Sequence, residues 1–110
     1  MKKIIIAGLL LTSIILSGFC AEKTRVLLIV GGHSFDTNQF YKMFSDNSQI
    51  MYQAAEHPEA LRLLKPESAV NFDVIVLYDL WQKITDEDKT NFLKFLESGK
   101  GLVVLHHAIA

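Results

Sequence analysis

The chain has 110 residues, half of them hydrophobic, and its eleven basic and twelve acidic side chains give a net charge of −1 at pH 7. A charge balance this close to neutral excludes the strongly basic surface that nucleic-acid binding requires. Cys20 is the single cysteine, so a disulfide within the chain is excluded as well.

The first twenty residues have the pattern of a secretory signal peptide. Two lysines follow the initial methionine, residues 4–16 form an apolar stretch, and small residues surround a cleavage point near Cys20. Because a membrane-spanning helix needs ~20 apolar residues, the shorter stretch favours a cleaved signal over an anchor. We expect an exported protein, periplasmic or extracellular, with lipid attachment at Cys20 as the alternative. The mature domain, residues 21–110, then carries nine basic and twelve acidic residues, a charge of −3.

Three apolar runs without alternation predict strands that are buried on both faces. They are residues 26–30, 74–77 and 102–105. Such runs are typical of a parallel sheet that helices cover on both sides. Residues 49–54 alternate weakly between apolar and polar side chains, which predicts an additional edge strand.

Capping and turn residues predict helices between these strands. Asp36 is a candidate N-cap for a first helix, and residues 58–64 predict a short helix with proline in its first turn. Residues 66–71 predict a loop. Thr85 is the expected N-cap of the clearest helix, because acidic residues follow it, and Gly99 supplies the stop.

The alternation of strands and helices predicts a doubly wound α/β fold. Right-handed crossovers place the loops after the three apolar strands on one edge of the sheet, where ligands of such folds bind. The sequence ends shortly after the strand at 102–105, which would leave the next layer of the sheet uncovered. We therefore expect a truncated gene product or a fragment of a longer domain.

The predicted edge gathers residues suited to acid–base chemistry. His33 and Asp36 follow the first apolar strand, Asp79 follows the second and His106 the third. Histidine titrates near neutral pH and a carboxylate can orient it, so these four are candidate catalytic residues. The structural alternatives are a helix cap for Asp36, which we favour, and a turn position for Asp79.

A second set of residues on this edge predicts contacts with a ligand. Gly31 and Gly32 allow a close backbone approach, but the G-x-G-x-x-G pattern of dinucleotide binding is incomplete. Tyr78 and Trp81 are suited to stacking on a sugar ring or, alternatively, to covering a helix end. His107 is a further candidate substrate-binding residue.

Whether a metal can bind depends on the directions in which the rings of His106 and His107 point. If the strand continues through them, their rings point to opposite faces and only one can join His33. A three-histidine zinc site requires the strand to end at Leu105, with a carboxylate nearby. A divalent metal is therefore an alternative to metal-free acid–base chemistry, and no other cofactor is indicated. His57 is expected on the surface, at the opposite end of the pattern from His106 and His107.

Three segments resemble the ThuA-like (trehalose utilisation) family, which is similar in fold to class I glutamine amidotransferases. They are residues 31–36 (GGHSFD), 72–77 (FDVIVL) and 98–108 (SGKGLVVLHHA). The resemblance covers residues 25–110 and about the first half of the family domain. It implies a flavodoxin-like three-layer parallel sheet, here truncated after the fourth strand, and a link to sugar use.

One departure from the amidotransferase pattern limits the expected chemistry. In those enzymes a nucleophilic cysteine follows the strand that corresponds to residues 102–105, and here His106 takes its place. Glutamine hydrolysis through a thioester is therefore excluded for the mature chain. The resemblance implies an exported ThuA-like protein that acts on a small-molecule sugar or derivative. The alternatives are a non-catalytic sugar-binding or scaffold domain and an inactive fragment, with membrane contact only through the signal or a lipid anchor.

Overall fold

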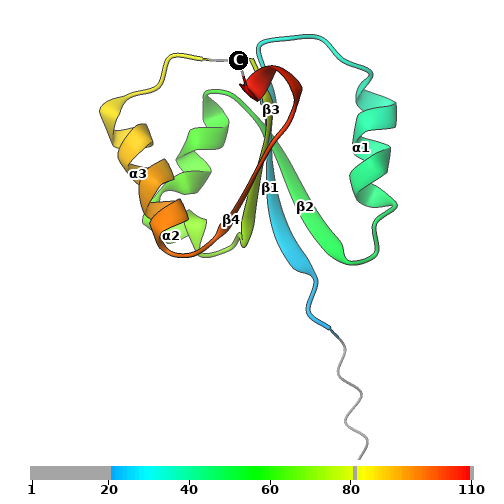
Figure 1. The fold of residues 1–110 in the computed structure, drawn as a ribbon, viewed down its shortest axis with the longest axis horizontal. Coiled ribbons are helices and arrows are strands. Elements are labelled where there is room, and N and C mark those ends of the chain that lie inside the picture. The colour runs from blue at the N-terminus through cyan, green and yellow to red at the C-terminus, as the bar shows by residue number, and fades with distance from the viewer. Residues whose placement is uncertain (1–20, 81, 110) are drawn as a thin grey trace, which may run out of the picture.

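A computed structural model describes residues 21–80 and 82–109, which form a parallel four-stranded sheet with helices between the strands (Figure 1). The strand order is β2-β1-β3-β4. The predicted α/β class is confirmed, and the arrangement is consistent with a flavodoxin-like fold. The predicted signal peptide and Trp81 lie outside the described residues. The strands are β1 (Thr24–Gly31), β2 (Ile50–Glu56), β3 (Val74–Asp79) and β4 (Gly101–Val104).

Helices cover both faces of this sheet. Helix α1 (Thr37–Ser45) lies on one side, and α2 (Pro66–Ala69) and α3 (Asp86–Glu97) lie on the other (Figure 1). The 3₁₀ helix η1 (Glu59–Leu64) packs on the same side as α3. Within the described residues, no helix combines the length and the hydropathy that crossing a bilayer requires.

Strand β1 lies at the centre of the sheet and contributes to two cores. Leu27 and Ile29 pack with Phe95 on the α3 side, whereas Leu28 packs with Phe44 on the α1 side. Leu27, Leu28 and Ile29 have no exposed surface. An apolar run without alternation therefore marks a central parallel strand here, as predicted, because both of its faces need hydrophobic side chains.

The last apolar run differs from the prediction. Leu102 and Val103 are 39% and 43% exposed, so β4 is not buried on both faces. Within the described part of the chain, β4 pairs only with β3 and forms one edge of the sheet. Hydrophobicity of the sequence predicted the strand correctly, but burial depends on the layers that pack against it.

The predicted helix caps at Asp36 and Thr85 are confirmed. The Asp36 carboxylate accepts a hydrogen bond from the backbone N–H of Gln39 at 3.1 Å, at the start of α1. Thr85 and Asp88 form a reciprocal capping box at the start of α3. Each cap satisfies backbone N–H groups that have no partner inside the helix.

Of the two connecting segments, one is confirmed and one differs from the prediction. The short helix predicted at 58–64 is present as the 3₁₀ helix of residues 59–64, directly after Pro58, whereas the expected loop at 66–71 contains the short helix α2. Pro66 opens α2 because a missing N–H costs nothing in the first helical turn.

Strand β2 is an edge strand in the described sheet, as predicted, but it continues to Glu56. Its register pairs Val30 with Glu56, and the backbone N–H of His57 donates to the Val30 carbonyl at 2.9 Å. This pairing carries His57 to the carboxyl edge of the sheet. The prediction that His57 lies on the surface, away from this edge, is wrong: its side chain is 7% exposed.

Candidate functional site

The carboxyl ends of the four strands meet at one edge of the sheet. Gly31 lies beside Asp79 in the register of β1 and β3. The backbone N–H of Leu80 donates to the Gly31 carbonyl, and that of Leu105 donates to the Leu77 carbonyl, both at 2.9 Å. These contacts hold the loops that follow β1, β3 and β4 against one another, and the candidate residues lie on these loops.

Three histidines from two of these loops form a cluster. Strand β4 ends at Val104, and a 3₁₀ turn begins at His106, whose φ is 53°. A non-glycine residue with positive φ is uncommon and is found more often at functional sites. The turn brings both rings towards His33, with ring centroids 5.9 Å away for His106 and 5.1 Å for His107. One of the two conditions for a three-histidine site, a strand that ends by Leu105, is therefore met. The other, a nearby carboxylate, is not met, because Asp36 caps α1 and Asp79 pairs with His57.

The ring of His33 is held by two backbone carbonyls. Its Nδ1 lies 3.2 Å from the Ser34 carbonyl oxygen, and its Nε2 lies 3.2 Å from that of Tyr78. A neutral imidazole has one N–H, so it donates to one carbonyl and keeps a lone pair on the other nitrogen. Metal-binding histidines characteristically donate their second ring N–H to such a group. One carbonyl beside His33 fits that pattern, but the nitrogen that would bind a metal also lies 3.2 Å from a carbonyl oxygen, so the ring must turn away from that oxygen for a metal ion to bind.

The geometry of the three histidines suits a metal ion with a small adjustment. One ligand atom from each of the three rings lies within 4.8 Å of the others. Histidine nitrogens bound tetrahedrally to zinc at 2.0–2.1 Å stand about 3.4 Å apart, so the rings must move closer together for all three to bind one ion. Partial desolvation is the main cause that lowers the pKa of His107, and the charges of the neighbouring His106 and His33 lower it further. A lowered pKa favours the neutral imidazole, which is the form that binds metals.

Tyr78 supports this cluster from the α1 side of the sheet. Its ring stacks on Phe40 at a centroid distance of 4.1 Å and meets His33 edge-on at 4.9 Å. Phe35 packs edge-on against the same ring at 5.3 Å. The ring of Tyr78 thus belongs to the packing beneath the histidines, and Phe40 occupies one of its faces. Trp81, the other predicted stacking residue, lies outside the described part of the chain.

Gly31 and Gly32 allow the turn that leads from β1 to His33. Gly32 has φ of +79°, and a Cβ atom there would come within 2.9 Å of the Leu80 Cβ. Gly31 has φ of +132°. Both values lie in a region that side chains disfavour, so the backbone conformation by itself requires glycine at these positions.

The two candidate carboxylates do not join the histidine cluster. Asp36 caps α1. Asp79, the last residue of β3 rather than a turn residue, pairs with His57, with 3.4 Å between its Oδ2 and the His57 Nε2. Asp79 lies on the same side of β3 as Ile75, towards α3, because alternate strand residues share a face. Sequence reasoning missed His57, and only the pairing of β2 with β1 would have revealed it.

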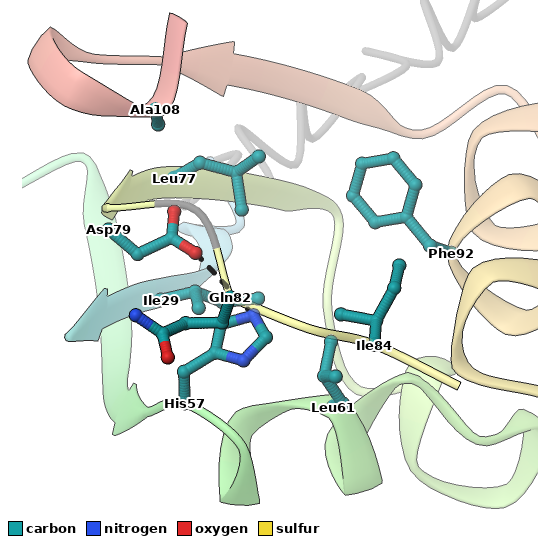
Figure 2. Close-up of a pocket in the computed structure, with 9 residues that line it drawn as sticks. All are labelled: Ile29, His57, Leu61, Leu77, Asp79, Gln82, Ile84, Phe92 and Ala108. Atoms are coloured by element: carbon teal, nitrogen blue, oxygen red, sulfur yellow. Dashed lines mark ion pairs between the residues drawn. The ribbon is translucent and has the colours of Figure 1, made fainter. Parts of the chain in front are cut away.

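His57 and Asp79 border a cavity of about 200 Å³ on the α3 side of the sheet (Figure 2). Burial raises the pKa of the Asp79 carboxyl group, while the charges of His57 and His33 and a backbone hydrogen bond oppose the shift. The edge therefore holds two polar groups: the histidine cluster (His33, His106 and His107) and the buried pair (His57 and Asp79).

Comparisons with known proteins give no relative: no family model, curated protein or solved structure matches this chain. Fold and site together define an α/β protein, consistent with the flavodoxin-like arrangement, that has a histidine cluster at the carboxyl edge of its sheet.

Proposed function

We propose that this chain is an exported, ThuA-like domain that binds a divalent metal ion through the histidine cluster and uses it to act on a small sugar or sugar derivative. The single observation that carries the metal proposal is the approach of three histidine ligand atoms to within 4.8 Å of one another. Imidazole is the commonest protein ligand for zinc-like ions.

Within the histidine cluster, the absence of a carboxylate among the described residues removes the orienting group of metal-free acid–base chemistry, although the carboxylate expected beside a zinc site is also absent there. A histidine that acts as a general base is commonly oriented by a carboxylate. Here Asp79 pairs with His57, and Asp36 caps α1. The side chain of His33 is instead held by carbonyl oxygens, which is the arrangement expected around a metal ligand.

His106 and His107 are exposed, while His33 is partly buried. A small hydroxylated molecule would therefore reach the cluster from the solvent side. A divalent ion held there would polarise a hydroxyl or carbonyl oxygen of such a molecule. His33 would keep its orientation through one of the two carbonyls, that of Ser34 or that of Tyr78, because its other ring nitrogen would bind the ion. The sugar class and the export are supported by the sequence resemblance and by the pattern of the first twenty residues.

Calorimetric titration of the metal-free protein with Zn²⁺ tests the metal site. We expect one ion per chain, and His33→Ala or His107→Ala should each weaken binding at least about tenfold, because losing one of three ligands removes much of the site. His57→Gln is the matched control: it removes the remaining histidine, which lies on the α3 side, and should leave the affinity for Zn²⁺ unchanged. Wild-type protein that binds no Zn²⁺, or equal affinities in all four proteins, would contradict the proposal.

A sugar panel then separates the enzyme from the alternative, a non-catalytic binding domain. The Zn²⁺-loaded protein is incubated with mono- and disaccharides, and both binding and product formation are measured. We expect turnover that a chelator abolishes and that His107→Ala lacks. Binding without any product, retained in the chelator, would favour the non-catalytic sugar-binding domain.

A further inference from the structure

The cavity beside the buried pair lies between the sheet, η1 and α3. Leu61 of η1 and Phe92 of α3 form two of its walls, and Ile84, before α3, forms a third. Figure 2 shows Asp79 and His57 facing each other at one end, with Ile84 and Phe92 at the other. The cavity is thus mostly apolar, with a polar end at the carboxyl edge of the sheet.

The polar end of the cavity lowers the stability of the folded protein unless a ligand supplies the missing hydrogen bond. The side chains of His57 and Asp79 are 7% and 10% exposed. The His57 Nδ1 atom is buried and has no hydrogen-bond partner among the described residues. Burying a polar atom without a partner costs about 1–3 kcal/mol, and such groups in native proteins call for an explanation. One polar atom left unsatisfied beside a cavity points to a ligand at that end.

The size and lining of the cavity limit what it can hold. A volume of about 200 Å³ is below the range of roughly 300–1,000 Å³ that is usual for drug-sized ligands. The apolar walls suit a compact hydrocarbon body. Asp79 pairs with the Nε2 of His57; when that nitrogen carries the ring proton, the Nδ1 atom, which has no partner among the described residues, is a hydrogen-bond acceptor, which suits a molecule with a donor such as a hydroxyl group.

We propose that His57, Asp79 and the adjoining cavity form a second binding site, on the opposite face of the sheet from the histidine cluster, for a small alcohol or phenol. The hydroxyl group of this ligand donates to the buried Nδ1 of His57, and its apolar body lies against Leu61, Ile84 and Phe92. None of the three clustered histidines lines this cavity, so its ligand needs no contact with the proposed metal, although Ala108, next to His107, forms part of the lining.

Phenol, with toluene as its hydroxyl-free counterpart, is the probe for this site. The isotope-labelled protein is titrated with each compound, with and without Zn²⁺, and chemical shifts of the His57 ring nitrogens and of the amides around residues 79–84 are followed by NMR. We expect saturable shifts with phenol, unchanged by Zn²⁺, and binding of toluene at least about tenfold weaker because it cannot donate a hydrogen bond.

Two variants locate the binding. Asp79→Asn removes, without changing the shape, the carboxylate that keeps the proton on His57 Nε2 and leaves Nδ1 as the acceptor, and Ile84→Trp fills the cavity from a position that is 41% exposed. Each should weaken phenol binding at least about tenfold, whereas Asp46→Asn, a matched substitution on the surface at the end of α1, should leave it unchanged. If Asp79→Asn does not fold, Ile84→Trp decides the test.

Three results would overturn this second site. They are the absence of saturable phenol binding in the wild-type protein, toluene binding as tight as phenol binding, and phenol binding that Ile84→Trp leaves intact. A failure of Zn²⁺ binding would contradict the proposed function alone, because the phenol titration is also made without the metal.

Discussion

Two aspartates at opposite ends of strand β3 have opposite environments. Asp73, directly before the strand, accepts hydrogen bonds from the Arg25 backbone N–H at 2.8 Å and from its guanidinium at 2.6 and 3.0 Å. These bonds lower the pKa of Asp73 to about 2. Asp79, the last residue of the strand, is buried, and burial raises its pKa.

The comparison separates polar groups that stabilise the fold, at the amino end of the sheet, from polar groups that are poorly satisfied, at its carboxyl end. At the amino end of the sheet, every hydrogen bond of Asp73 favours its charged form. At the carboxyl end, Asp79 is desolvated, His57 Nδ1 lacks a partner among the described residues, and three histidines crowd together. Perturbed ionisable groups of this kind gather at functional sites, which is why both proposed sites lie at the carboxyl end.

The largest effect is expected from the middle of the same strand. Ile75 has no exposed surface and packs in the core beneath α3. Ile75→Ala should lower the free energy of unfolding by about 2–5 kcal/mol, because it leaves a cavity. Chemical denaturation measures the change. A smaller loss of unfolding free energy would mean that the packing of Ile75 in the core contributes little to holding β3 in place.

Asp73→Asn should have a smaller effect with a distinctive dependence on pH. Since the side chains of Arg25 and Asp73 are 37% and 40% exposed, solvent screens the pair and the loss should be about 1 kcal/mol. The folded-state pKa is lower than the ordinary value of 3.8, so the charged form stabilises the protein above that value. The difference from wild type should disappear as pH falls from about 4 to about 2. A difference that is as large at pH 2 as at pH 7 would contradict this account.

Asp79→Asn should change stability slightly in the opposite direction. The raised folded-state pKa means that the charged carboxylate is less favourable in the folded protein than in the unfolded chain. At pH 7 the variant should therefore unfold at the same or a slightly higher temperature than wild type. As pH falls through the raised pKa, wild-type Asp79 takes up a proton and the advantage of the variant should shrink. Thermal unfolding across this pH range makes the comparison; clear destabilisation at pH 7 would show that the pair with His57 outweighs the cost of burial.

The smallest effect is expected at Asp46, which provides the baseline for the aspartate series. Its side chain is 61% exposed and pairs with Lys42 one turn earlier in the sequence. Asp46→Asn should change the free energy of unfolding by no more than about 0.5 kcal/mol, since exposed ion pairs contribute little. A larger change in the same denaturation experiment would show that an exposed aspartate in a surface ion pair contributes more to stability than expected.

Local patterns predicted the elements of this fold better than they predicted the site. The apolar runs gave three strands, and Asp36 and Thr85 gave the starts of two helices, because capping and periodicity depend on neighbouring residues. The convergence of His33 and His106 was also predictable, since parallel strands bring their carboxyl ends to one edge. Which carboxylate meets which histidine was not predictable, because that depends on strand register and on the face that each side chain takes.

The sequence by itself determined that strands and helices alternate, that β1 is buried on both faces, and that histidines follow the first and last of the apolar strands. Only the tertiary structure decided that His107 joins His33, because β4 ends at Val104 and the chain turns there. Only the pairing of β2 with β1 brought His57 to Asp79. Backbone conformation is set largely by neighbouring residues, whereas contacts between side chains depend on the packing of segments that are distant in the chain.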